Sequence, residues 1–562
     1  AEKSWTLGEV EAAFASAAHH IHCDVDHARL APSPMETRAI SVRYNTDASL
    51  TIWLSSQTPH RAREQLASIL NISAERLDVI ATDVGGAFGM KASIYPEDVM
   101  AVWFALKHKR SVRWSASRSE DFLSATHGRG ISSSGTLAVS EDGLFVGLKA
   151  KVMAPVGRWV PNSGLIPAWN AARILPGPYN VPAVDIETKA VAANLAPTGI
   201  YRGAGRPEAN MLMERLVEKA ARVTGLSSME IRRLNLLPAN AMPKRTPTEN
   251  VLDSGDYLAL METLKTAGHY DARIAARDAA RAQGKLRGVG VGFYLEPSGE
   301  GWESARVTMQ ADGAVLVATG GSGQGQARET AFAQIAADAL GVPMDRIDVQ
   351  CGDTQSCPTG IGALASRSTA IGGSAVLTAC EELNDRLGAG EKLPLTAEVR
   401  YENKGQAWGY GGYFADVQVN RDTGEVDILD AFSIDDAGRI INPAFAEGQV
   451  RGGFAQGLGE ALMERMVYDD QGQLLTGSLM DYALPRADDM PPLRLQTMET
   501  PSPTNALGAK GIGEAGTIGA PIVIVNAVLD ALWPLGVTDL EMPLTPHRVW
   551  QAIKDAEGGP KP

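Results

Sequence analysis

The sequence predicts an α+β fold with more than one domain, on three observations. The chain has 562 residues, more than one hydrophobic core usually organises. Segments with strand-like and helix-like periodicity are mixed along it, without the regular alternation of a doubly wound sheet. A highly charged helix predicted at residues 270–283 has little apolar face and indicates a boundary. Length alone allows about two to four compact units, and the helix places a boundary near residues 265–285, so we divide the chain into mixed α/β parts at residues 1–265 and 266–562.

The first half shows several well-defined periodic segments. Helical periodicity occurs at residues 9–20, 60–70, 96–108 and 208–224. A strand pair is predicted within residues 39–55 around the turn N-T-D-A, and further strands at 77–80, 111–115, 144–153 and 184–192. The polar, proline-bearing segment 237–251 is typical of a surface loop.

The second half begins again with strands. We predict a strand at 288–295, a hairpin of 305–310 and 314–319 around Ala311-Asp312-Gly313, and another hairpin within 416–430. Helices are predicted at 329–340, 447–464 and 522–533. The most apolar stretch, 518–537, is interrupted by proline and polar residues, so it predicts a core helix rather than a membrane span.

The composition excludes several classes of function. Hydrophobic residues make up 44% and charged residues 21%, as in an ordinary soluble globular protein. The net charge of −14, with no basic stripe, argues against binding to nucleic acid or to an anionic membrane. The four cysteines form no C-x-x-C pair, so neither a zinc ribbon nor an iron–sulfur cluster is encoded, and ordinary buried thiols are expected: Cys23, Cys351, Cys357 and Cys380.

The 58 glycines fall in clusters rather than repeats, which favours loops that cradle a ligand. Five glycine-rich loops are found at residues 83–91, 198–207, 320–326, 360–375 and 511–521, and four of them run directly into helices. Helix N-termini and successive backbone N–H groups bind anionic ligands without lysine. Because neither a P-loop nor a clean dinucleotide-binding fingerprint is present, ATP and NAD sites are not expected.

The last of these loops, G-I-G-E-A-G-T-I-G-A-P, contains one carboxylate, Glu514. A carboxylate on a shaped, poorly hydrated loop is what a general base requires, because burial raises its proton affinity toward working pH. The alternative is a surface loop whose glutamate caps the next helix. This stretch alone leaves both interpretations open.

Polar side chains near the other loops suit a hydrogen-bond-rich cofactor: Gln57, Arg202, Gln326, Ser366–Thr369 and Lys510, with Phe88 among them. Each also has a plain structural interpretation. Gln57 could bond its local backbone, Phe88 could be core, and Arg202 could pair only with Glu208.

Six motifs together resemble the molybdopterin-binding subunit of the molybdenum hydroxylases, the group of xanthine dehydrogenase, aldehyde oxidoreductase and carbon monoxide dehydrogenase. They run in order over nearly the whole chain: D-V-G-G-A-F-G-M-K, Y-R-G-A-G-R-P-E-A, G-Q-A-R-E-T-A-F-A-Q-I, A-S-R-S-T-A-I-G-G, D-D-A-G-R-I-I-N-P with E-G-Q-V-R-G-G-F-A-Q-G-L-G-E-A-L, and K-G-I-G-E-A-G-T-I-G-A-P. The resemblance implies a molybdenum cofactor between the two domains, with the metal held by the pterin dithiolene and not by protein side chains.

The resemblance also implies roles for individual residues. Glu514 corresponds to the catalytic base, and Gln57 to the glutamine beside a molybdenum oxo group. The remaining implied cofactor-binding residues are Gly86, Phe88 and Gly89 beside the metal, Arg202 through its backbone, Gly325 and Gln326, the loop Ser366, Arg367, Ser368 and Thr369, and Lys510, Gly511 and Gly513. The cytosine dinucleotide form of molybdopterin is expected.

Three departures from the family pattern bear on substrate. Ala92 stands where purine-oxidising relatives carry a glutamate, and Gly203 stands where carbon monoxide dehydrogenases carry a cysteine, so purines and carbon monoxide are both disfavoured. The usual G-Q-G is G-Q-A here, with Ala327 at its end.

We expect oxidation of an aldehyde to a carboxylic acid, with water as the oxygen source. The alternative is hydroxylation of an N-heteroaromatic ring beside its nitrogen, and a further alternative is a non-catalytic subunit that only holds cofactor. The expected partners are a [2Fe-2S] electron-transfer subunit, a chain supplying the family's N-terminal hammerhead-type domain, a flavin (FAD) or cytochrome subunit, and a small-molecule substrate, without nucleic acid. The cytoplasm is the expected compartment, with the periplasm as the alternative.

Overall fold

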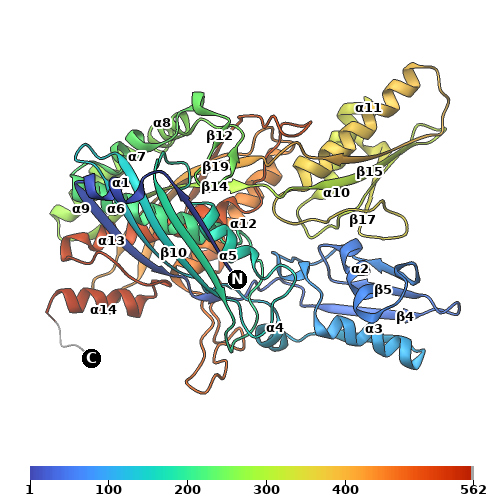
Figure 1. Ribbon diagram of the computed structural model, residues 1–562, viewed down its shortest axis with the longest axis horizontal. Helices are drawn as coiled ribbons and strands as arrows, with labels where there is room; N and C mark the ends of the chain where they lie inside the picture. Colours follow the sequence, from blue (N-terminus) through green and yellow to red (C-terminus); the bar gives the residue numbers. More distant parts are fainter. Residues whose placement is uncertain (559–562) are drawn as a thin grey trace.

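The computed structural model describes residues 1–558 and consists of a large body from which two small lobes extend on one side (Figure 1). The body contains a five-stranded and a four-stranded sheet, and each lobe contains one four-stranded sheet. The mixed α+β class predicted from the sequence is therefore confirmed.

The N-terminal half contributes the five-stranded sheet of the body, in the order β1-β11-β10-β9-β2. Its strands are β1 (Glu2–Leu7), β2 (His19–Asp26), β9 (Ser132–Val139), β10 (Phe145–Pro155) and β11 (Val184–Val191). Helix α6 (Arg206–Thr224) covers this sheet, and Gly135 lies beneath its Leu212 and Leu216. Strand β2 was not predicted.

The predicted helix at residues 9–20 is wrong over its second half. Helix α1 ends at Ser16 (Val10–Ser16), and the chain then enters β2. The segment H-H-I-H-C-D-V-D alternates, with Ile21, Cys23 and Val25 buried, which is the period of a half-buried strand. The alanine-rich sequence before it extended the apparent helical period across the boundary.

The first small lobe follows the sequence-based prediction closely. It contains β4 (Ala39–Tyr44), β5 (Leu50–Leu54), β6 (Leu77–Ile80) and β7 (Val112–Ser115), with α2 (Pro59–Leu70) and α3 (Pro96–His108). The lobe has its own core, which includes Val42, Ile52 and Val102. Its strands and helices alternate clearly, so local periodicity was sufficient to place them.

The second lobe repeats the topology of the first. It contains β15 (Trp302–Met309), β16 (Val315–Thr319), β17 (Ile347–Cys351) and β18 (Leu395–Glu402), with α10 (Arg328–Leu340) and α11 (Ser374–Gly388). The strand orders β6-β5-β4-β7 and β17-β16-β15-β18 correspond strand for strand, each with one parallel pair. The lobes meet where the Val79 N–H donates to Thr354 Oγ1 at 2.9 Å.

The second half of the body has a sheet in the order β14-β19-β20-β21. Its strands are β14 (Leu286–Pro297), β19 (Trp408–Val419), β20 (Val426–Asp436) and β21 (Leu493–Met498). Helix α13 (Ala515–Leu532) packs across β14, and α12 (Pro443–Leu462) packs on α13. Among the described residues, the stretch Ala515–Leu535 is long and apolar enough to cross a membrane, and 83% of its most apolar window is buried inside the protein.

Several glycines serve helix packing rather than a ligand. A Cβ atom on Gly288 would lie 2.0 Å from the Ala527 carbonyl oxygen, and one on Gly290 would lie 2.2 Å from that of Val523, so β14 and α13 approach closely only because these residues are glycine. A Cβ on Gly453 of α12 would lie 3.0 Å from Gly516 of α13. Helix α13 begins at Ala515, so the predicted loop 511–521 is in fact shorter.

One hydrophobic core runs through both sheets of the body. Helices α8 (Tyr257–Ala267) and α9 (Tyr270–Ala282) lie at the predicted boundary, and Leu264 of α8 packs in the same core. The division at residue 265 stays a prediction. The other helices of the body are α4 (Arg118–Ser124), α5 (Ile166–Arg173), α7 (Ser228–Asn235) and α14 (Pro546–Ala556), and its short strands are β3 (Arg29–Leu30), β8 (Gly128–Arg129), β12 (Lys244–Arg245) and β13 (Val251–Leu252).

The four cysteines are buried free thiols, as expected from their spacing.

Candidate active site

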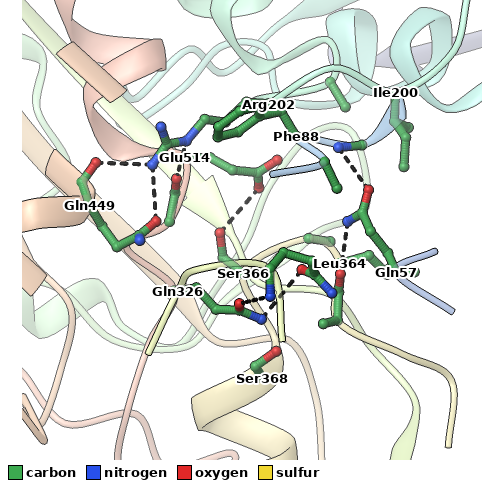
Figure 2. A pocket seen from close by; sticks show the side chains of 18 of the residues that line it. Gln57, Phe88, Ile200, Arg202, Gln326, Leu364, Ser366, Ser368, Gln449 and Glu514 are labelled. Atoms are coloured by element: carbon green, nitrogen blue, oxygen red, sulfur yellow. Dashed lines mark hydrogen bonds between the residues drawn. The ribbon is translucent and has the colours of Figure 1, made fainter. Parts of the chain in front are cut away.

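A cavity of about 560 Å³ lies where the body meets the two lobes, and glycine-rich loops from both halves of the chain line it (Figure 2). Most of the predicted site residues reach it: Gln57, Phe88, Gly89, Arg202, Gly325, Gln326, Ser366, Ser368, Thr369, Lys510, Gly511, Gly513 and Glu514. Residues more than 450 positions apart in the chain therefore share one cavity wall.

Glu514 lies at the start of α13, with its carboxylate directed toward the cavity (Figure 2). Its side chain is 12% exposed. Oε1 accepts the backbone N–H of Gly203 at 2.8 Å, Oε2 accepts from Arg206 Nη1 at 2.6 Å, and the Ser366 hydroxyl lies 3.4 Å from Oε2. The carboxylate makes no side-chain capping bond to its own helix, so the interpretation of Glu514 as a cap on a surface loop is wrong.

Arg206 is a site residue that the sequence-based prediction missed. It is buried at the first position of α6, and besides Glu514 it binds the carbonyl of Pro297 through Nη2 at 2.7 Å. A buried carboxylate needs a cation or hydrogen-bond donors to remain ionised. The second arginine of Y-R-G-A-G-R-P was the available signal.

The guanidinium of Arg202 lies in the cavity lining and bonds both to helix α12 and to the loop that precedes α13. Its Nη2 donates to both the backbone carbonyl and Oε1 of Gln449 at 3.0 Å, and its Nη1 donates to Gln456 Oε1 at 3.0 Å. Its Nε donates to the carbonyl of Gly513 at 2.5 Å. Arg202 therefore ties α12 to the loop before α13 and does not pair with Glu208.

Phe88 is not a core residue. Its ring is 36% exposed at the cavity, and the Arg202 guanidinium lies 5.7 Å from the ring centroid. Its carbonyl accepts the backbone N–H of Arg202 at 3.0 Å, which joins the first two glycine-rich loops.

Gln57 links the two halves of the cavity. Oε1 accepts the N–H of Gly89 at 2.9 Å, and Nε2 donates to the carbonyl of Ala363 at 2.8 Å (Figure 2). An amide nitrogen carries two hydrogens, so one N–H of Gln57 remains for a ligand.

The loop before α10 is held by its own amides. Gln326 Oε1 accepts the N–H of Gln324 at 2.5 Å, and Gln326 Nε2 donates to the carbonyl of Ser322 at 3.1 Å. Ala327 follows with φ +58°, a left-handed conformation that favours glycine, so the G-Q-A departure falls on a strained position.

Three predicted residues do not present their polar groups to the cavity. Arg367 is fully buried and binds Glu303 Oε1 at 2.5 Å. Gly86 lies behind Phe88 and does not line the cavity. Lys510 borders the cavity, but its buried ammonium lies 3.3 Å from Asp436 Oδ1, so its charge is directed into the body.

Of the departures that bear on substrate, Gly203 has a local structural explanation. Gly203 has φ +98°, and a Cβ there would lie 2.7 Å from Pro207 Cγ, so a side chain at this position would strain the loop that holds Glu514. Ala92 is buried and carries no hydrogen-bonding side chain.

The fold and the glycine-rich cavity are shared with a known class of protein, the molybdopterin-binding subunits. Residues 1–236 match the molybdopterin cofactor-binding domain, and residues 263–392 and 388–491 match a second family of the same description. The chain belongs to the molybdenum hydroxylase family and is a molybdenum-dependent oxidoreductase subunit.

Several members of the family are similar to this chain over nearly its whole length. The chain is 31% identical to the nicotine 6-hydroxylase large subunit of Paenarthrobacter nicotinovorans, over 98% of this chain and 75% of that one. It is 30% identical to the carbon monoxide dehydrogenase large chain of Hydrogenophaga pseudoflava, over 98% and 77%. Quinoline 2-oxidoreductase from Pseudomonas putida 86 superposes with a TM-score of 0.95 at 32% identity, over 99% of this chain and 79% of that one.

The cavity fits a molybdenum–pterin cofactor in the chemistry of its donors. Its lining offers amide, hydroxyl and backbone groups, and a Cβ on Gly511 would lie 2.6 Å from Ser366 Cβ, so the wall admits no side chain there. Within residues 1–558 no group of three or more His, Cys, Asp or Glu side chains is placed to hold a metal ion. A cofactor whose metal is held by its own pterin needs no such group.

Proposed function

We propose that this chain is the catalytic subunit of an enzyme that hydroxylates an N-heteroaromatic ring at a carbon next to the nitrogen, with Glu514 as the base. The observation that carries the role of the base is the carboxylate of Glu514, which lies at the cavity wall between Arg206 Nη1 at 2.6 Å and the Gly203 N–H at 2.8 Å. The cofactor, when bound, supplies the oxidising centre that accepts two electrons from the substrate.

The chain's own residues would prepare and hold the base. Arg206 and the Gly203 N–H both stabilise the ionised carboxylate, so Glu514 is ready to accept a proton before the substrate enters. Arg202 donates to the carbonyl of Gly513, the residue before Glu514, and this bond keeps the Glu514 carboxylate directed into the cavity. Gln57 would orient the cofactor with its remaining N–H.

The apolar side chains in the cavity lining favour an apolar substrate. Phe88, Ile166, Ile200 and Leu364 line the cavity, and Phe88 and Ile166 are exposed at 36% and 45%. Two of the relatives at 31–32% identity are named for nicotine and quinoline, both of which contain a nitrogen ring. The aldehyde oxidation expected from the sequence would use Glu514 in the same way, so the wall and the relatives, rather than the base, favour the ring.

We further propose the cytosine dinucleotide form of the cofactor and electron transfer to a [2Fe-2S] subunit, with a flavin subunit in the same assembly. The relatives named as large subunit and large chain support a multi-subunit enzyme.

Steady-state assays of the complete enzyme with quinoline, isoquinoline and nicotine beside benzaldehyde test the substrate class. We expect kcat/KM to be higher for at least one ring compound, with oxygen from labelled water in the product. Turnover of benzaldehyde alone would overturn the ring proposal in favour of the aldehyde. Metal analysis with hydrolysis of the cofactor tests its form, since stoichiometric molybdenum with released CMP is expected.

A further inference from the structure

A second buried carboxylate lies directly beside the base. Glu296, near the end of β14, is 1% exposed. Its Oε1 accepts the backbone N–H of Glu514 at 3.2 Å, and its Oε2 has no hydrogen-bond partner among the described residues. No motif in the sequence pointed to Glu296, because it lies 218 positions from Glu514.

The position of Glu296 is fixed by the segment around it. The hydroxyl of Ser298 accepts the N–H of Gly511 at 2.9 Å, and the carbonyl of Pro297 accepts from Arg206 Nη2 at 2.7 Å. Three consecutive residues of the chain thus hold the two ends of the catalytic loop and the cation that pairs with the base. The two carboxylates cannot separate without breaking these bonds.

The charges around the pair do not balance two ionised carboxylates. Arg206 is committed to Glu514, and Arg202 is committed to Gln449, Gln456 and the Gly513 carbonyl. The other titratable group that faces Glu296 from the sheet is Tyr294, which donates to Asp435. Burial, and next the negative charge of Glu514, raises the pKa of Glu296 to about 7. Arg206 and the Ser366 hydroxyl act to lower the pKa of Glu296, but less strongly than burial and Glu514 raise it.

We propose that Glu296 is a positioning residue that shares one negative charge with the base, remaining protonated while Glu514 is ionised against Arg206. The inference rests on the proposed role of Glu514 as base. Since each charge disfavours the other, loss of the Glu296 proton strengthens the affinity of Glu514 for a proton. Glu296 therefore determines the pH range in which the base is strong.

Infrared difference spectra of the holoenzyme, recorded without substrate over about pH 5 to 9, test the shared charge. A protonated buried carboxyl has a carbonyl band distinct from that of a carboxylate. We expect a band that disappears as pH rises through neutrality and that is absent from Glu296→Gln. In Glu514→Gln the midpoint of this band should move to lower pH by about one unit or more, because the neighbouring charge is gone.

Glu464 provides a matched control. It is also buried, bonds Tyr482 at 2.7 Å outside the cavity, and its burial raises its pKa to about 8. Its band, identified with Glu464→Gln, should keep its midpoint in Glu514→Gln.

Kinetics provide the second readout. Across the alkaline half of the range, we expect Glu296→Gln to lower kcat about three- to tenfold, because the neutral amide cannot strengthen the base. The acidic limb of the kcat/KM profile should stay in place, because Glu296 is already neutral there. Glu296→Asp keeps an ionisable group and should retain a titrating carbonyl band at a different midpoint. It replaces Glu296→Gln in the test if the glutamine variant does not fold.

The proposal is overturned if no band is lost in Glu296→Gln, or if the Glu296 midpoint is the same with and without the Glu514 carboxylate. Because the spectra need no substrate, an incorrect choice of substrate leaves this test intact. Full activity in Glu514→Gln would instead remove the proposed function while the coupling between the two carboxyls could still be measured.

Discussion

The side-chain amide of Gln57 donates to the carbonyl of Ala363 at 2.8 Å, across 306 positions of sequence. The same amide accepts the N–H of Gly89 at 2.9 Å, so one glutamine joins a loop of the first half to a loop of the second. Gln57 is 5% exposed, and its bonds replace those that water would make to two buried backbone groups. Gln57 therefore holds together two loops that line the cavity.

Replacement of Gln57 by leucine should therefore destabilise the junction. The substitution leaves the Gly89 N–H and the Ala363 carbonyl unpaired, at a cost of about 2–4 kcal/mol. Denaturant unfolding measures the free energy of unfolding, and molybdenum content measures cofactor retention. Gln57→Glu is the matched control, because it keeps the acceptor for Gly89 and loses only the donor to Ala363. Unchanged stability of Gln57→Leu would contradict the bridging role.

Glu514→Gln should abolish turnover while the cofactor stays bound. The amide has the size of the carboxylate but cannot accept a proton, so a loss in kcat of about 10²–10⁴-fold or more is expected. Molybdenum analysis verifies loading, and single-turnover reduction measures the chemical step. Glu447→Gln, on the exposed face of α12 beside Arg451, serves as the control and should retain activity. Undiminished turnover would exclude Glu514 as the base.

Arg206→Met should shift the pH dependence of the reaction. Removal of the guanidinium 2.6 Å from Glu514 Oε2 disfavours the ionised carboxylate, so the acidic limb of kcat/KM should move to higher pH by about 1–3 units. Arg206→Lys keeps the positive charge and should move the limb less, though it loses the bond to the Pro297 carbonyl. Coincident profiles for Arg206→Met and the native enzyme would show that this ion pair does not control the base.

Ala327→Gly should stabilise the protein slightly. The left-handed φ of +58° costs a side-chain-bearing residue about 1–2 kcal/mol, whereas the extra freedom of glycine in the unfolded chain costs about 0.4–1 kcal/mol. The free energy of unfolding should thus rise by up to about 1 kcal/mol. Ala333→Gly, inside α10, is the control and should be destabilising. A loss of stability in Ala327→Gly would show that the strain is relieved elsewhere.

Two buried histidines should make the protein acid-sensitive. Burial lowers the pKa of His60 and of His127 to about 4, below the ordinary value of 6.5. Between these values the unfolded chain binds more protons than the folded one, so stability falls as pH drops from about 6.5 to about 4. Tm measured across this range should fall less steeply in His127→Gln than in the native protein. Parallel curves would mean that His127 takes no part in acid unfolding.

Local periodicity determined much of the fold. The strands and helices of the first lobe were predicted within two residues, because each has a clear period and turn residues between its neighbours. Strand β2 was missed because an alanine-rich helix runs into it. The prediction also missed helices α8 and α11 and several strands: β1, β9, β17, β18 and β21.

The candidate site was predictable where it depends on short motifs. The loops that carry Phe88, Arg202 and Glu514 are each compact in sequence, and their glycines and polar residues indicated a ligand. Arg367 and the ammonium of Lys510 were misassigned, because whether a charged side chain faces a cavity or a buried partner depends on residues such as Glu303 and Asp436 that are distant in the chain.

By itself the sequence determined the class of protein and the element types of the first lobe, and it singled out Glu514 as the candidate base. Only the tertiary structure decided that Arg206 and Glu296 flank that base and that Gly288 and Gly290 admit α13 rather than a ligand. The physical reason is that the proton affinity of a buried carboxylate depends on charges and donors within a few ångströms. Those neighbours come from α6, β14 and α13, whose approach is set by packing and not by any local pattern.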